Sequence, residues 1–139
     1  MKKILVQLFI APAIIFSVFS CGSKGGGGGG GGGSEANLVV TLNPPANSTQ
    51  PAAPQTDFPL TVSITSTMPP QGVTIDVKAA PDGSATNFFT ESRSSTAANN
   101  NFTITSTPIT VVCLVTVTVT SKTKATNTVT LSYRYSRKP

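Results

Sequence analysis

The side chains that could do chemistry are few and scattered in this chain of 139 residues. Histidine is absent, and only five side chains are acidic: Glu35, Asp57, Asp76, Asp82 and Glu91. Catalysis needs an acid, a base or a nucleophile held together in a pocket. The acids here are isolated in the sequence, and the serines have no histidine to act as their base. We therefore expect a protein that is not an enzyme.

Metal and cofactor sites are not expected either. Asp82, Gly83 and Ser84 could suggest a calcium loop. Calcium takes six to eight oxygen ligands, however, and this segment offers a single carboxylate. We interpret it as a turn and predict neither a metal nor a cofactor.

Cys21, the first of two cysteines, follows a segment typical of an export signal. Lys2 and Lys3 precede a mostly apolar run over residues 4–19, and the small Ser20 comes directly before the cysteine. As a helix the run would be about 24 Å long, short of the ~30 Å hydrocarbon core of a bilayer. Residues 1–20 therefore read as a signal peptide, and a permanent membrane span is the alternative.

The residues Val18-Phe19-Ser20-Cys21 resemble the lipobox of the bacterial lipoproteins. Phe19 is bulkier than the strict pattern prefers, which resembles the looser lipoboxes of the Bacteroidota. The resemblance implies cleavage before Cys21, a diacylglycerol on its sulfur and an acyl chain on its new amino group. Three chains would hold the protein at a membrane effectively permanently. The implied location is the cell envelope, at the outer membrane, with its surface and periplasmic faces both open. A structural thiol is the alternative role for Cys21.

Residues 21–36 are expected to form a disordered tether. Nine consecutive glycines occupy residues 25–33, and a glycine run has no side chains to bury and maximal backbone entropy. Such a tether has a root-mean-square reach of roughly 20 Å. A phosphate-binding loop would need a lysine after its glycines, whereas Lys24 precedes them, so nucleotide binding is not expected.

The remainder of the chain, residues 37–139, alternates apolar and polar side chains with period two, the pattern of half-buried strands. The fourth of the resulting strands is the weakest. Seven are predicted, at or within residues 38–42, 58–64, 73–77, 87–92, 102–104, 111–119 and 129–135. Seven short strands at this spacing favour two antiparallel sheets packed face to face. This all-β architecture resembles the bacterial immunoglobulin-like domains, although the tryptophan of antibody domains is missing.

Two segments of this domain allow more than one interpretation. Cys113 shares its parity with four valines, so we expect a buried, inert thiol, with an interchain disulfide as the alternative. Residues 44–57 are too rich in proline for a central strand. They form either an extended crossover between the first two strands or a continuation of the stalk, with the fold starting at Asp57.

The best candidates for a binding contact are Phe88 and Phe89, because neighbouring residues of a strand point to opposite faces. One ring would enter the core, and the other would stand outside unless a loop such as residues 44–57 covered both. Loss of Lys2 and Lys3 with the signal would lower the formal charge from +5 to +3. The remaining basic residues lack interleaved aromatics, so nucleic-acid binding is not expected.

We therefore expect a non-catalytic lipoprotein that presents a small immunoglobulin-like module for a structural or protein-interaction role. Its expected partners are the membrane, through the lipid anchor, and another envelope protein or a glycan. The alternative function is a carbohydrate- or adhesin-type surface binder, which would need exposed aromatics to stack on sugar rings. A uniformly polar threonine and serine surface would favour the structural module.

Overall fold

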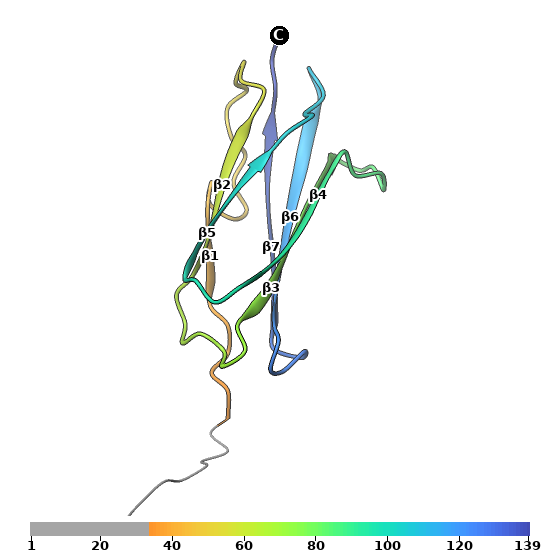
Figure 1. Cartoon of the computed structure of the whole chain (residues 1–139). Coiled ribbons are helices and arrows are strands. Elements are labelled where there is room, and N and C mark those ends of the chain that lie inside the picture. The colour runs from red at the N-terminus through yellow and green to blue at the C-terminus, as the bar shows by residue number, and fades with distance from the viewer. Residues whose placement is uncertain (1–33) are drawn as a thin grey trace, which may run out of the picture. The chain divides into compact units, whose positions relative to one another are not determined.

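The computed structural model describes residues 34–139, and Figure 1 shows these as two layers of strands. The expected signal peptide over residues 1–20, Cys21 and the expected tether up to residue 33 lie outside the described residues. The described part contains no helix and consists of seven strands. They are β1 (Val40–Asn43), β2 (Phe58–Ile64), β3 (Val73–Pro81), β4 (Phe89–Ser95), β5 (Asn99–Ile104), β6 (Val112–Ser121) and β7 (Thr128–Ser136).

The seven strands form two antiparallel sheets, with the orders β1-β2-β5 and β4-β3-β6-β7. The predicted β-sandwich is therefore confirmed. In antibody constant domains the fourth strand lies in the same sheet as the first two. Here β4 pairs with β3 instead, from Val73 opposite Ser95 to Ala79 opposite Phe89. This fourth strand also extends three residues beyond the predicted end at Ser92.

The core lies between the sheets and follows the predicted parity. Along β6 the side chains alternate between buried and partly exposed from Cys113 onward. The buried valines of this strand, Val115, Val117 and Val119, lie opposite Tyr133, Leu131 and Val129 of β7. The opposite parity carries threonines that pair across the strands, with Thr118 and Thr130 hydroxyls 3.2 Å apart and Thr120 and Thr128 hydroxyls 2.9 Å apart. Period-two alternation thus separated core from surface correctly.

Residues 44–57 belong to the fold, and the alternative in which the fold starts at Asp57 is wrong. After β1 the chain leaves the first sheet through a cis peptide bond at Asn43–Pro44. It then runs parallel to β7 in the other sheet, with Thr49 opposite Arg134 and Ala53 opposite Arg137. Backbone hydrogen bonds of 2.8 Å join Gln50 N to Arg134 O and Arg134 N to Ser48 O. The crossover therefore covers the edge of β7 that would otherwise be open to another strand.

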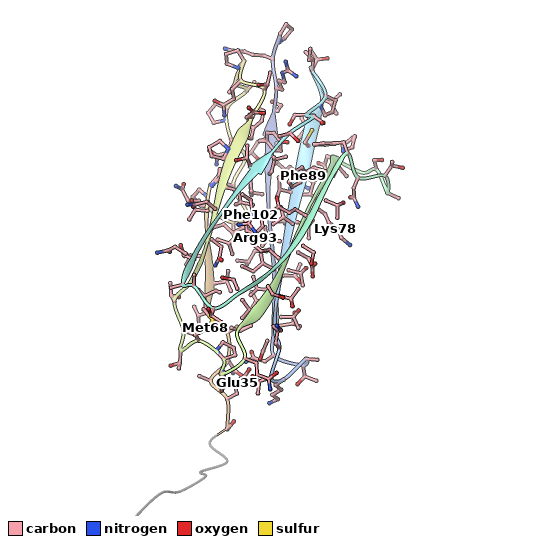
Figure 2. All side chains as sticks on the ribbon, viewed as in Figure 1. Glu35, Met68, Lys78, Phe89, Arg93 and Phe102 are labelled. Atoms are coloured by element: carbon pink, nitrogen blue, oxygen red, sulfur yellow. The ribbon has the colours of Figure 1, made fainter. Side chains whose placement is uncertain are left out.

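The fold also begins earlier than predicted, because the last residues of the expected tether dock on the turn between β6 and β7. The Asn127 side chain is buried there. Its Nδ2 donates to Glu35 Oε1 and to Ala36 O, and its Oδ1 accepts the Leu38 N–H at 2.9 Å. Glu35 lies at the end of the sandwich where the described chain begins (Figure 2). The predicted boundary at residue 37 is thus two residues too late.

The other edge of the larger sheet is β4, whose inward parity carries charges. Glu91 and Arg93 form an ion pair with each other. Arg93 also donates to Asn101 O of β5 at 3.0 Å. Its guanidinium lies 4.5 Å from the centre of the Phe102 ring, and Figure 2 shows the two residues side by side. Inward-pointing charges on an edge strand oppose pairing with a further strand. This edge is therefore closed by charge, whereas the β7 edge is closed by the crossover.

Candidate functional site

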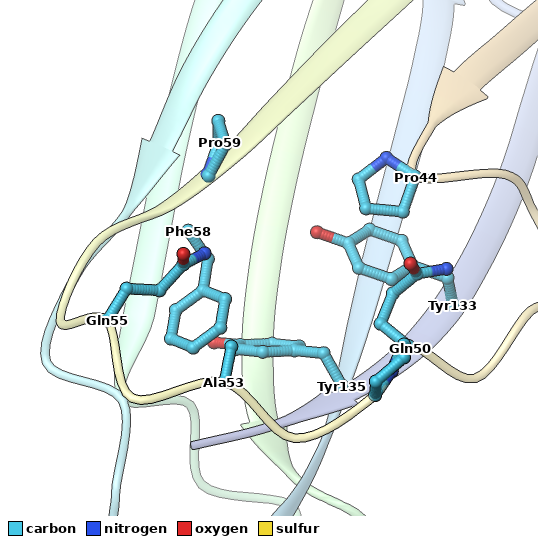
Figure 3. A pocket seen from close by; sticks show the side chains of 9 residues that line it. Pro44, Gln50, Ala53, Gln55, Phe58, Pro59, Tyr133 and Tyr135 are labelled. Carbon is cyan, nitrogen blue, oxygen red and sulfur yellow. The ribbon is translucent and has the colours of Figure 1, made fainter. Parts of the chain in front are cut away.

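A pocket of about 170 Å³ lies beneath the crossover. Its walls come from three parts of the chain that are distant in sequence: the crossover, the start of β2 and the C-terminal half of β7 (Figure 3). The nine lining residues are Pro44, Gln50, Pro51, Ala53, Gln55, Phe58, Pro59, Tyr133 and Tyr135. None of them carries a charge at neutral pH. The pocket exists because residues 44–57 arch from one sheet to the other over the inward face of β7.

The floor of the pocket is an aromatic cluster. Alternation places Tyr133 and Tyr135 on the same face of β7, and both are almost completely buried. The ring centroids of Phe58 and Tyr135 are 4.4 Å apart, and those of Tyr133 and Tyr135 are 6.1 Å apart. Both pairs are tilted, an arrangement in which the electron-poor edge of one ring can approach the face of another. The cluster therefore forms an apolar floor of closely packed rings.

The two tyrosine hydroxyls of this cluster differ sharply. The Tyr135 hydroxyl lies 2.7 Å from the buried hydroxyl of Thr107, and burial raises its pKa to about 12 even though this hydrogen bond acts in the opposite direction. The Tyr133 side chain is 2% exposed, and its hydroxyl has no hydrogen-bond partner in the described protein. Burial also raises the pKa of Tyr133, so the group stays a neutral hydrogen-bonding phenol. Buried polar groups are normally paired, and the Tyr133 hydroxyl is one of four buried side-chain atoms without a partner within residues 34–139; it is the one that lines this pocket.

Polar groups at the rim come from two glutamines of the crossover. The Gln50 amide nitrogen donates to Ser48 Oγ at 2.7 Å, which holds the side chain in place. Gln55 is exposed. Each amide can both donate and accept hydrogen bonds. The pocket thus combines apolar walls, one buried phenol and two neutral amides.

Sequence reasoning did not identify this pocket. It placed Tyr133 and Tyr135 inward by their alternation, and it interpreted residues 44–57 as either an extended crossover or a continuation of the stalk. The parallel pairing of that crossover with β7 had no local signal, since nothing in residues 44–57 specifies the strand with which they pair.

The predicted pair Phe88 and Phe89 lies elsewhere, at the start of β4. Both rings are half-buried and pack against the core, so neither stands fully on the surface. Strict alternation did not apply because β4 begins at Phe89, and Phe88 precedes it with its N–H bonded to Ala79 O at 2.9 Å. The suggested cover was wrong, because the crossover lies along β7, at the opposite edge of the sheet. A contact role for this pair stays a prediction.

The two predicted cysteine roles have different outcomes. Cys113 is fully buried, as expected, and burial raises the pKa of its thiol. It is a free cysteine within residues 34–139. Cys21, the predicted lipid attachment site, lies outside the described residues.

The surface of the described part is polar on both sheets. No aromatic side chain within residues 34–139 is exposed, and the large apolar side chains that are exposed there are Val39, Ile109 and Val112. On the smaller sheet the outer face pairs hydroxyls with amides, as in Thr61 to Asn101 at 2.9 Å and Ser63 to Asn99 at 2.8 Å. The larger sheet presents the paired threonines described above.

Acidic side chains stay apart in the described region. Asp82 pairs with Arg134, with 2.7 Å between Oδ2 and Nε, and residues 34–139 contain no group of three or more side chains suited to hold a metal ion. In the same region no helix is long and apolar enough to cross a membrane. Comparisons of the chain with protein-family models, with curated proteins and with solved structures found no match.

Proposed function

We propose that this protein is a non-catalytic, lipid-anchored lipoprotein whose β-sandwich serves a structural or protein-interaction role at the cell envelope. Two features of the sequence support the anchor. They are the three-part export signal over residues 1–20 and the lipobox-like segment that ends at Cys21. The glycine-rich residues that follow would separate the folded domain from the membrane.

One observation supports this role over carbohydrate binding on an open surface. A surface that stacks on sugar rings needs exposed aromatic faces, and every aromatic side chain within residues 34–139 is buried or half-buried. The outer faces instead carry threonine, serine and asparagine hydroxyls and amides that bond to one another. This surface supports a structural or protein-interaction module.

The position of the pocket is compatible with a tethered domain. The described chain begins beside the turn between β6 and β7, to which Asn127 binds Glu35 and Ala36. The pocket is lined by the start of β2 and the C-terminal half of β7, toward the opposite end of the sandwich (Figure 1). Ser34, the first described residue, and the pocket therefore lie toward opposite ends of the domain.

Metabolic labelling with a fatty acid tests the anchor. We expect label on the wild-type protein and on Cys113→Ala, and no label on Cys21→Ala, because the buried Cys113 thiol is not the proposed attachment site. In cell fractionation, we expect the wild type in the membrane fraction and Cys21→Ala either in the soluble envelope fraction or as unprocessed precursor. Equal labelling of the wild type and Cys21→Ala would contradict the lipoprotein proposal.

A further inference from the structure

The pocket beneath the crossover has the size of one six-membered ring. Engineered protein cavities of ~150 Å³ bind benzene, and this pocket has a volume of about 170 Å³. Drug-sized ligands occupy larger clefts, of roughly 300 Å³ and more. The occupant is therefore a single ring, presented either by a small molecule or by the side chain of a larger one.

The walls favour a neutral ring with apolar faces. Proline rings, Ala53 and the aromatic cluster supply most of the lining, and no lining residue is charged at neutral pH. A charged group would lose its hydration here without gaining a partner of opposite charge. The tilted packing of Phe58 on Tyr135 also leaves a surface against which a further aromatic ring can pack.

The buried hydroxyl of Tyr133 adds selectivity. It points into the middle of the lining side chains in Figure 3 and has no partner in the described protein. Tyr133 is 2% exposed, so a ring with one hydroxyl at its inner end would satisfy this group by displacing the side chains that cover it. A sugar ring carries several hydroxyls, and most of them would meet proline and aromatic walls that offer no hydrogen bond, at a cost for each unpaired group. A phenol matches this pocket better than a pyranose.

At the rim, the amides of Gln50 and Gln55 are suited to a polypeptide. Each side-chain amide offers the same donor and acceptor pair as a peptide group. We propose that the pocket binds one tyrosine side chain of a partner polypeptide, with its phenol at Tyr133 and its flanking peptide groups at the two glutamines. This inference gives the proposed interaction role a binding site and rests on that role.

Amino-acid amides are the probes that test the proposal. The full chain, labelled with ¹⁵N and purified in detergent, is titrated with N-acetyl-tyrosinamide, N-acetyl-phenylalaninamide and a methyl glucoside. We expect N-acetyl-tyrosinamide to cause saturable shifts of amide resonances within residues 50–58 and 131–136. A hydrogen bond of ordinary strength corresponds to roughly a tenfold change in dissociation constant, so the phenylalanine probe should bind about tenfold more weakly.

Two variants provide matched controls. In Tyr133→Phe the preference for the tyrosine probe should disappear while the phenylalanine probe binds as before. In Ala53→Leu the larger side chain should fill the pocket and abolish binding of both probes. The resonances of residues remote from the pocket show whether each variant keeps the fold.

Three outcomes would overturn the proposal. These are no saturable shift with the tyrosine probe, equal binding of the tyrosine and phenylalanine probes to the wild type, or tighter binding of the glucoside than of either. Probe binding does not depend on acylation of Cys21. Failure here with successful lipid labelling would therefore reject the pocket and leave the anchor standing.

Discussion

Replacing Tyr135 by phenylalanine should destabilise the protein through one hydrogen bond. The hydroxyls of Tyr135 and Thr107 lie 2.7 Å apart, although the residues are separated by 28 positions in sequence. Tyr135 is 1% exposed and Thr107 is 2% exposed, so water cannot replace the missing partner without a rearrangement. Tyr135→Phe keeps the ring and its contacts with Phe58 and leaves the Thr107 hydroxyl buried and unpaired.

The cost follows from that unpaired group. A buried donor or acceptor left without a partner costs about 1–3 kcal/mol, so we expect a loss of about 2 kcal/mol in the free energy of unfolding. That is a large share of the ~5–15 kcal/mol typical of a domain. For a domain of this size it corresponds to a fall in melting temperature of about 10 °C.

Tyr133→Phe is the matched control, because it makes the same substitution two residues earlier in the same strand. The Tyr133 hydroxyl has no partner in the described protein, so its removal leaves nothing unpaired. We expect a change within about 0.5 kcal/mol or a small gain in stability. Urea and thermal denaturation of both variants measure the difference. Equal losses in the two variants would show that Tyr133 has a partner in solution and would refute the reasoning for both hydroxyls.

Two further predictions concern the burial of Val117 and the ionisation of the Tyr135 hydroxyl. Val117→Asp places an unpaired charge at a position that is 1% exposed and should lower the free energy of unfolding by several kcal/mol. Thr118→Asp on the outer face should lower it far less. A reversed order of urea midpoints would contradict the register of β6. Burial raises the pKa of Tyr135 to about 12, while an unfolded tyrosine ionises near 10. The unfolded state therefore loses its proton first, and stability should fall by about 1.4 kcal/mol per pH unit for this group as the pH rises from about 10 to 12. Tyrosinate absorbance of the folded protein checks this directly, since the chain has two tyrosines and no tryptophan, and ionisation near pH 10 would count against it.

Much of the β-sandwich could be predicted because a half-buried strand has an alternating apolar and polar pattern in its own sequence. Side chains alternate between the two faces of a strand, so a run such as residues 113–119 shows its buried face without knowledge of any neighbour. Cys113, Val115 and Val117 were placed in the core on this basis, and all three are buried. Breaks in the alternation marked most turns, although several strand ends were misplaced. The start of β1 was misplaced by two residues, and the end of β4 and the start of β5 by three. The third strand also continues to Pro81, beyond its predicted end at residue 77.

The candidate site could not be predicted in the same way, because each of its features depends on a meeting of distant segments. The two tyrosines of β7 have the same alternation and the same side chain. Thr107 lies beside the hydroxyl of Tyr135, whereas the hydroxyl of Tyr133 has no hydrogen-bond partner within residues 34–139. The sequence by itself therefore determined the strands and their inward faces, since both follow from the order of neighbouring residues. Only the tertiary structure decided that residues 47–53 pair with β7, that Asn127 binds Glu35 and Ala36, and that the Tyr133 hydroxyl has no partner within residues 34–139. Such contacts arise from chain segments brought together by folding, and no spacing along the chain encodes them.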